Sequence, residues 1–187
     1  MSFILNIESS TTNCSISLAL NGKVISLKEI NDEKYSHSTK LHSFIEEVLK
    51  ESNLKITQLS AIAISKGPGS YTGLRIGVAA AKGLCFSLDI PLISISTLLI
   101  LSKQIKISSG LIVPVLDARR DEVYSAIYDF NYKLVKEESP EIIDNISFHN
   151  YSKDNEIYFI GSGQKKCKEL IESNSNLIFY NKETYPS

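Results

Sequence analysis

Apolar and polar residues alternate over the first thirty positions in a way that predicts three short β-strands. Phe3–Ile7 is a short apolar run, Cys14–Leu20 alternates apolar with small polar residues, and Lys23–Ile30 resumes the strand pattern. Between the last two, Asn21-Gly22 is a strong signal for a tight type I′ hairpin turn. We therefore expect the chain to open with three consecutive strands.

The pattern then changes to helical spacing. A helix is expected over Tyr35–Ser52, capped by Ser36 or Ser38, because apolar residues recur there at helical intervals: Leu41, Phe44, Ile45, Val48 and Leu49. Beyond it, Ala61–Ser65 and Leu92–Ile95 are apolar runs of the length of a buried strand, one on each side of a helix rich in small residues. This order favours parallel strands joined by helical crossovers. A further helix is expected from Ser96/Thr97 to about Lys106.

The second half repeats the design of the first. Leu111–Leu116 reads as a buried strand, Glu122–Phe130 as an amphipathic strand, and Asn131-Tyr132 as a turn into a strand at Lys133–Glu138. Ser139–Asn155 has weak periodicity and receives no firm assignment. The rest is expected to form a strand, a turn and a helix: Ile157–Ile160, Gly161-Ser162-Gly163 and Gln164–Ser173.

These elements predict an α/β protein of two related lobes with mixed sheets, each of β-β-β-α-β-α design. The lobe boundary is expected near residues 106–110, giving lobes 1–107 and 108–187, the second of them reduced. In both lobes a polar turn follows the first strand, Glu8-Ser9-Ser10-Thr11 in one and Asp117-Ala118-Arg119-Arg120 in the other.

Composition narrows the functional classes. The 187 residues are 43% hydrophobic and 22% charged with a net charge of −1, which indicates a globular protein without the basic excess of an autonomous nucleic-acid binder. The three cysteines, Cys14, Cys85 and Cys167, are far apart and form no CxxC pair, so we expect reduced, packed thiols and a cytoplasmic location. No apolar run is long enough to predict a membrane span.

The segment between the two central strands holds the most distinctive pattern. Gly67, Pro68, Gly69 and Gly73 crowd into seven residues, but Leu74-Arg75 follow where a Walker P-loop needs Lys and Ser or Thr. The turn therefore serves close packing or holds an anion, with Arg75 either beside that anion at the helix N-terminus or in a surface ion pair. The next residues are small on nearly every helical face, which implies contact on two sides: Gly77, Ala79, Ala80, Ala81 and Gly83.

Other chemical motifs are weak. Glu8–Thr11 reads as an anion-binding turn or a capped turn, and Asp117–Glu122 as an active-site edge or a salt-bridged surface turn. His37 and His42 are five residues apart rather than four, so a zinc pair on one helical face is not predicted. No GxSxG elbow indicates a serine hydrolase.

With these residues in view, the chain resembles the glycoprotease-like family of tRNA threonylcarbamoyladenosine synthesis, in its non-catalytic branch. The resemblance rests on segments that occur in family order: Ile4–Thr11, the helix opening at His37-Ser38, Gly67–Gly77 (GPGSYTGLRIG), Ser94–Thr97 and Asp117–Tyr124. It implies the actin/hexokinase-like fold of two ribonuclease-H-like lobes, which agrees with the duplicated pattern.

The resemblance also implies a role and partners. The chain is expected to be no enzyme itself but a scaffold that pairs with the threonylcarbamoyltransferase TsaD, which modifies the adenosine beside the anticodon. The ATPase TsaE is expected in a larger complex, tRNA is contacted only indirectly, and the chain alone is expected to form a homodimer. No metal or cofactor is expected for the chain itself; ATP or ADP at the joint interface with TsaD is left open.

Site residues follow from the resemblance position by position. The pairing helices carried over are Tyr35–Ser52 and Thr72–Ser87, and the expected interface residues are Tyr35, His37, Ser38, Leu41, Ile45, Tyr71, Thr72, Arg75, Ile76, Gly77, Ala79, Ala80 and Gly83. Vestigial phosphate-loop positions are Glu8, Ser9, Ser10, Thr11 and Asp117. Glu8 departs from the aspartate that many relatives carry. The chain also stops where the family usually continues into another helix and a tail.

Two alternative functions stay open. An ATP-binding phosphotransferase of the actin/hexokinase class would use Glu8, Thr11 and Asp117 to hold phosphate and metal. A metallopeptidase would need zinc ligands that the sequence does not offer.

Overall fold

The computed structural model describes residues 1–31, 37–180 and 184–187, and divides them into two compact units. The first unit is Met1–Thr97 together with Pro186–Ser187, and the second is Leu98–Tyr185. The division falls earlier in the chain than the boundary expected at residues 106–110. Leu98, Leu101 and Ile105 explain this, because their side chains pack with Ile112 and other buried residues of the second unit.

The first unit contains one five-stranded sheet of order β3-β2-β1-β4-β5. Its elements are β1 (Phe3–Glu8), β2 (Asn13–Leu20), β3 (Lys23–Asn31), α1 (His37–Glu51), the short 3₁₀ helix η1 (Ile56–Gln58), β4 (Ala61–Ser65), α2 (Tyr71–Leu88) and β5 (Leu92–Ile95). β1, β2 and β3 pair antiparallel, whereas β1, β4 and β5 run parallel. The three opening strands and the parallel crossover are therefore confirmed. Asn21 and Gly22 take φ values of 48° and 81°, as a type I′ turn requires.

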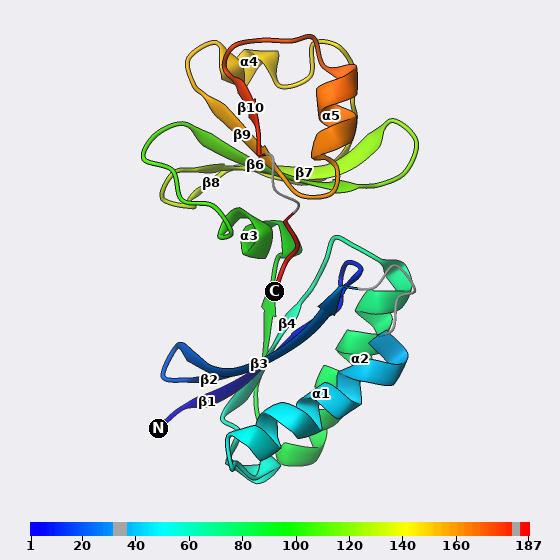
Figure 1. Ribbon diagram of the computed structural model, residues 1–187, viewed down its shortest axis with the longest axis vertical. Coiled ribbons are helices and arrows are strands. Elements are labelled where there is room, and N and C mark those ends of the chain that lie inside the picture. Colours follow the sequence, from blue (N-terminus) through cyan, green and yellow to red (C-terminus); the bar gives the residue numbers. More distant parts are fainter. Residues whose placement is uncertain (32–36, 181–183) are drawn as a thin grey trace. The chain divides into compact units, whose positions relative to one another are not determined.

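Both helices of the first unit cover the same face of the sheet (Figure 1). The core lies between the helices and the sheet, where alternate residues of β1 and β2 such as Leu5, Ile16 and Leu18 share one buried cluster with Leu41 and Val48 of α1. The opposite face of the same strands carries small polar side chains, Asn13, Ser15 and Ser17 among them. This alternation explains why β2 mixes apolar with small polar residues.

The second unit repeats the sheet in the order β10-β9-β6-β7-β8. Its elements are α3 (Thr97–Ser102), β6 (Leu111–Asp117), β7 (Glu122–Asp129), β8 (Leu134–Ile142), α4 (His149–Ser152), β9 (Ile157–Ile160), α5 (Gln164–Leu170) and β10 (Leu177–Phe179). α4 and α5 lie on one side of this sheet and α3 on the other (Figure 1). Both faces are thus covered, which accounts for the unbroken apolar run of β6.

Several predicted boundaries change in the structure. α1 is described from His37, so Tyr35 and Ser36 lie outside the described residues and Ser38 falls inside the helix rather than at its cap. α3 was expected to reach Lys106 but ends at Ser102. There Gln104 N–H bonds to the Leu101 carbonyl three residues back, which tightens the helix into a turn. α5 likewise ends at Leu170, short of Ser173.

The segment left without assignment holds regular structure. Ser139–Ile142 continues β8, and α4 follows at His149–Ser152. Pro140 obscures the strand in the sequence, yet β8 is an edge strand, where a missing N–H is tolerated.

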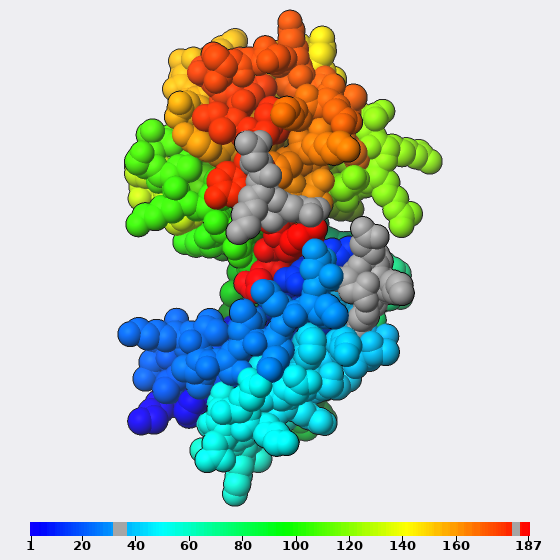
Figure 2. Space-filling model, in the orientation of Figure 1, coloured from blue at the N-terminus to red at the C-terminus, as the bar shows by residue number. Residues whose placement is uncertain are grey.

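The outer side of α1 lies beside β3 on the surface of the first unit, as Figure 2 shows. Lys28 of β3 forms an ion pair with Glu51 of α1 at 2.5 Å and approaches Glu47 at 3.9 Å. Two acids of α1 are therefore already engaged with a lysine of the same unit.

Candidate partner-binding site

The glycines of α2 bring the helix against the turn that follows β1. The hydroxyl of Ser9 donates a 2.9 Å hydrogen bond to the carbonyl of Gly73. A Cβ atom on Gly73 would overlap the carbonyl oxygen of Ser9, and one on Gly77 would overlap its hydroxyl. Gly69 is equally close to Ser10, whose carbonyl accepts the N–H of Ser70 at 2.6 Å. We call this arrangement the Ser–Gly contact: Ser9 and Ser10 against Gly69, Gly73 and Gly77.

The Ser–Gly contact corrects one expectation. Gly77 was expected to be an interface residue, but the structure buries it against Ser9 and Ile64 of its own unit. Gly83 is exposed, and nothing within 4 Å would meet an added Cβ. The two glycines therefore have different roles, and only the first is required by packing.

Glu8 sits beneath this contact and is 4% exposed. One carboxylate oxygen accepts hydrogen bonds from the N–H of Ser10 at 2.7 Å and from the hydroxyl of Ser65 at 2.9 Å. Burial raises the pKa of the carboxyl above its ordinary value of 4.5, although the bonds from Ser10 and Ser65 act in the opposite direction. The group ties the turn after β1 to the end of β4.

His37, at the start of α1, contacts the same turn through Thr11. Its Nε2 lies 2.8 Å from the carbonyl oxygen of Thr11, so Nε2 carries the proton and donates. The side chain is 1% exposed, and burial lowers its pKa despite the bond to Thr11. The buried histidine thereby joins the start of α1 to the turn after β1.

Asp117 occupies the position in the second unit that Glu8 has in the first, as the last residue of the first strand. Its Oδ1 accepts the N–H of Arg119 at 2.6 Å and the ammonium of Lys166 at 2.7 Å. Partial burial acts to raise the carboxyl pKa, but Lys166 and the Arg119 N–H lower it below its usual value. Glu8 and Asp117 belong to different units, and each accepts hydrogen bonds from residues of its own unit.

The described residues hold no cluster of three or more His, Cys, Asp or Glu side chains arranged to bind a metal ion. Neither α1 nor any other helix in the described ranges is long and apolar enough to cross a membrane.

One stripe of α2 points away from the core. Tyr71, Arg75, Ala79, Lys82 and Phe86 are spaced by three or four residues and are all exposed, so they share one side of the helix. Tyr71 is 68% exposed and Phe86 91%. The guanidinium of Arg75 lies 3.9 Å from the centre of the Tyr71 ring, a cation–π contact rather than a surface ion pair. We call these five residues, flanked by Thr72 and Gly83, the exposed α2 face.

The structure divides the predicted interface residues into three groups. His37, Leu41, Ile45 and Gly77 are buried in the first unit, which corrects their assignment as contact residues. Ile76 and Ala80 are half-buried. The exposed ones are Ser38, Tyr71, Thr72, Arg75, Ala79 and Gly83. Tyr35 lies outside the described residues.

Sequence reasoning missed Lys82 and Phe86. Both stand at helical spacing from Tyr71 and Arg75, and this spacing was the signal that could have found them. An exposed Phe in a helix whose buried side consists of Gly, Ala and Cys is hard to place from composition alone, because a large apolar residue is usually assigned to the core.

Comparison with known proteins places the chain in a family. The family model described as "TsaD: tRNA N6-adenosine threonylcarbamoyltransferase" matches residues 29–181. The tRNA threonylcarbamoyladenosine biosynthesis protein TsaB of Bacillus subtilis is 34% identical over 174 residues, which cover 90% of this chain and 75% of that protein. TsaB of Escherichia coli is 33% identical over 127 residues, 67% of this chain and 54% of the relative. The chain thus aligns with about half of the length of the second relative.

A solved structure supports the fold. A Pseudomonas aeruginosa protein described as similar to peptidase YeaZ superposes with a TM-score of 0.86 at 24% identity, over 100% of this chain and 86% of that one. The predicted two-lobed, actin/hexokinase-like α/β fold is confirmed. By its sequence matches and its fold, the chain belongs to the TsaB (YeaZ) family of tRNA threonylcarbamoyladenosine biosynthesis proteins, within the wider TsaD-type glycoprotease-like group.

Proposed function

We propose that this chain is a non-catalytic subunit that pairs with a TsaD-type threonylcarbamoyltransferase through the exposed α2 face. The observation that carries the proposal is Phe86, an aromatic side chain 91% exposed on the same stripe as Tyr71 and Arg75. Aromatic and arginine side chains are the residue types that concentrate binding energy at protein interfaces. The match to the TsaD family model shows that this chain is related in sequence to such transferases.

The chemistry of the predicted site residues supports a scaffold more than an enzyme. Glu8 is buried and accepts hydrogen bonds from Ser10 and Ser65, and the hydroxyl of Ser9 donates to the carbonyl of Gly73. Asp117 is neutralised by Lys166. One carboxylate oxygen of Glu8, and Asp117, which the alternative phosphotransferase would need to hold phosphate and metal, are thus engaged in contacts within their own units.

In this proposal the TsaE-type ATPase joins the assembly, and tRNA is contacted through the transferase. The place for a nucleotide in this proposal is the joint interface with the transferase rather than this chain alone. The same helix face also pairs weakly with a second copy when the transferase is absent.

Phe86→Ala tests the proposal. Because Phe86 is exposed in the free chain, its loss leaves the fold intact, but it should weaken binding to the transferase of the same organism by at least ~10-fold, the effect of a ~1.4 kcal/mol interface anchor. Ile146→Ala, which truncates another exposed apolar residue (62%), is the matched control. Titration calorimetry gives the affinities, and a reconstituted tRNA modification assay with each subunit omitted tests the requirement for this chain. Full binding by Phe86→Ala, or modification without the chain, contradicts the proposal.

A further inference from the structure

The exposed α2 face carries charge of one sign only. Tyr71–Leu88 contains Arg75 and Lys82 but no aspartate or glutamate. Among the described residues, neither cation has an ion pair, and the Arg75 guanidinium lies over the Tyr71 ring. The two cations are seven residues apart, two helical turns or about 10 Å along the axis.

The neighbouring helix does not supply the missing acid. Glu47 and Glu51 of α1 face Lys28 of β3. Glu46 points away from the buried side of α1 and stands four residues before Lys50, a spacing at which the two charges offset each other. Within the described ranges, Arg75 and Lys82 of the exposed α2 face therefore have no ion-pair partner on α1 or α2.

Pairing through this face with a second copy would bring these charges together. In a two-fold symmetric dimer built on this face the same patch would face itself, and an antiparallel alignment centred near Ala79 would set Arg75 of one copy against Lys82 of the other. Like charges across an interface weaken binding and suppress that pairing. If the facing helix belongs to another protein and carries carboxylates, this like-charge repulsion is absent.

We infer that the exposed α2 face is selective for an acidic partner helix. The occupant is an α-helix of the transferase subunit with carboxylates about two turns apart, at i and i+7, opposite Arg75 and Lys82, and with an apolar recess for Phe86. The same charges disfavour the homodimer. This inference rests on the proposed function and adds the chemistry of the partner and the reason that the mixed pair is preferred.

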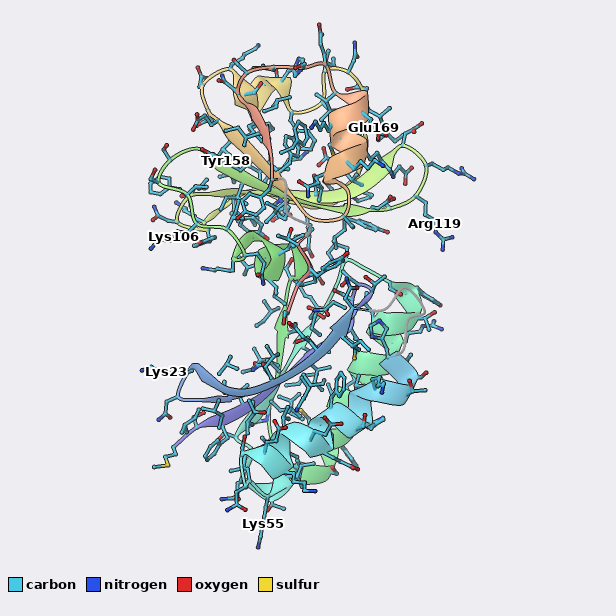
Figure 3. All side chains as sticks on the ribbon, in the orientation of Figure 1. Lys23, Lys55, Lys106, Arg119, Tyr158 and Glu169 are labelled. Carbon is cyan, nitrogen blue, oxygen red and sulfur yellow. The ribbon has the colours of Figure 1, made fainter. Side chains whose placement is uncertain are left out.

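The test is a double charge reversal, Arg75→Glu with Lys82→Glu. Lys23→Glu with Lys106→Glu makes the same change in net charge at two lysines that project into solvent from other elements (Figure 3). Both variants should keep the circular dichroism spectrum and Tm of the wild type. Calorimetry with the transferase at low and high salt, and analytical ultracentrifugation of single and mixed chains, give the readouts.

The reversal on α2 is expected to weaken transferase binding at least ~10-fold, with the difference shrinking as salt rises. Mixed with wild-type chain, the reversed variant should form a heterodimer tighter than either homodimer. The control pair should show neither effect. The charge inference is overturned if the reversed variant binds the transferase as well as wild type does, or if the mixture associates no better than wild type alone. Failure of folded wild-type chain to bind the transferase would instead refute the proposed function, and the mixing experiment would still decide the charge inference.

Discussion

The hydroxyl of Ser9 and the carbonyl of Gly73 form a 2.9 Å hydrogen bond across 64 positions of the chain. It joins the turn after β1 to the first turn of α2, and it exists because Gly73 has no side chain to hold the backbones apart. The glycine-rich segment is thereby explained within one unit. The opposite side of α2, from Tyr71 to Phe86, is exposed and is the side that we propose for the partner.

Two glycines of the same helix should respond oppositely to alanine. Gly73→Ala forces a Cβ into the backbone of Ser9 and is expected to lower the free energy of unfolding by ~1–3 kcal/mol. Gly83→Ala meets no atom within 4 Å and should raise it by up to ~1 kcal/mol through helix propensity. Urea denaturation of both variants measures the difference. Equal effects at the two positions would show that the Ser–Gly contact does not constrain the helix.

The buried carboxyl of Glu8 should make stability depend on pH. Its pKa is raised in the folded chain, so the folded state holds a proton that the unfolded state releases above about 4.5. The free energy of unfolding therefore falls as pH rises through the interval from 4.5 to the raised pKa. Glu8→Gln cannot titrate, so the stability of wild type relative to this variant should decline from pH 4 upward. The lowered pKa of His37 acts in the opposite direction but is common to both chains. A pH-independent difference between the two would refute the assignment.

The three cysteines should resist modification in the folded chain. Cys14, Cys85 and Cys167 are free and buried. Burial raises the pKa of the Cys14 thiol to about 11 and that of Cys167 to about 12, and raises that of Cys85 as well. Since the thiolate is the reactive form, a thiol reagent at pH 8 should label none of them quickly, whereas all three should react in denaturant. Rapid stoichiometric labelling in native buffer would contradict this packing.

The turn after β6 holds two arginines in the left-handed region. Arg119 has φ of 70° and Arg120 of 46°. A left-handed non-glycine residue costs about 1–2 kcal/mol, and glycine avoids this cost while losing ~0.5–1 kcal/mol in chain entropy. Arg119→Gly should therefore stabilise the fold by ~0.5–1 kcal/mol in thermal or urea unfolding. Lys23→Gly, at a strand position, should destabilise it; a loss of stability in both variants would argue against strain at Arg119.

Much of the architecture could be predicted from local patterns. Ala61–Ser65 and Ile157–Ile160 form strands within the predicted limits, and Asn21-Gly22 makes the predicted turn. Such features depend on side-chain periodicity and on the φ preferences of single residues. Both can be recognised from residues that are close together in the sequence. The strand at Ser139–Ile142 was missed because its support is the pairing with β7, where Glu122 lies opposite Ile142.

The sequence by itself determined the repeated α/β design, the crossover helix of small residues and the motifs that carry the family resemblance. Only the tertiary structure decided what those small residues do. Whether a glycine packs against a partner or against its own chain depends on a residue such as Ser9, which is far away in sequence. No local sequence pattern predicts that Ser9 lies next to the glycines of α2. For the same reason the structure, not the sequence, placed Leu41 and Ile45 in the core and Phe86 in solvent. Burial is a property of the whole fold, because each helix has several faces and packing chooses among them.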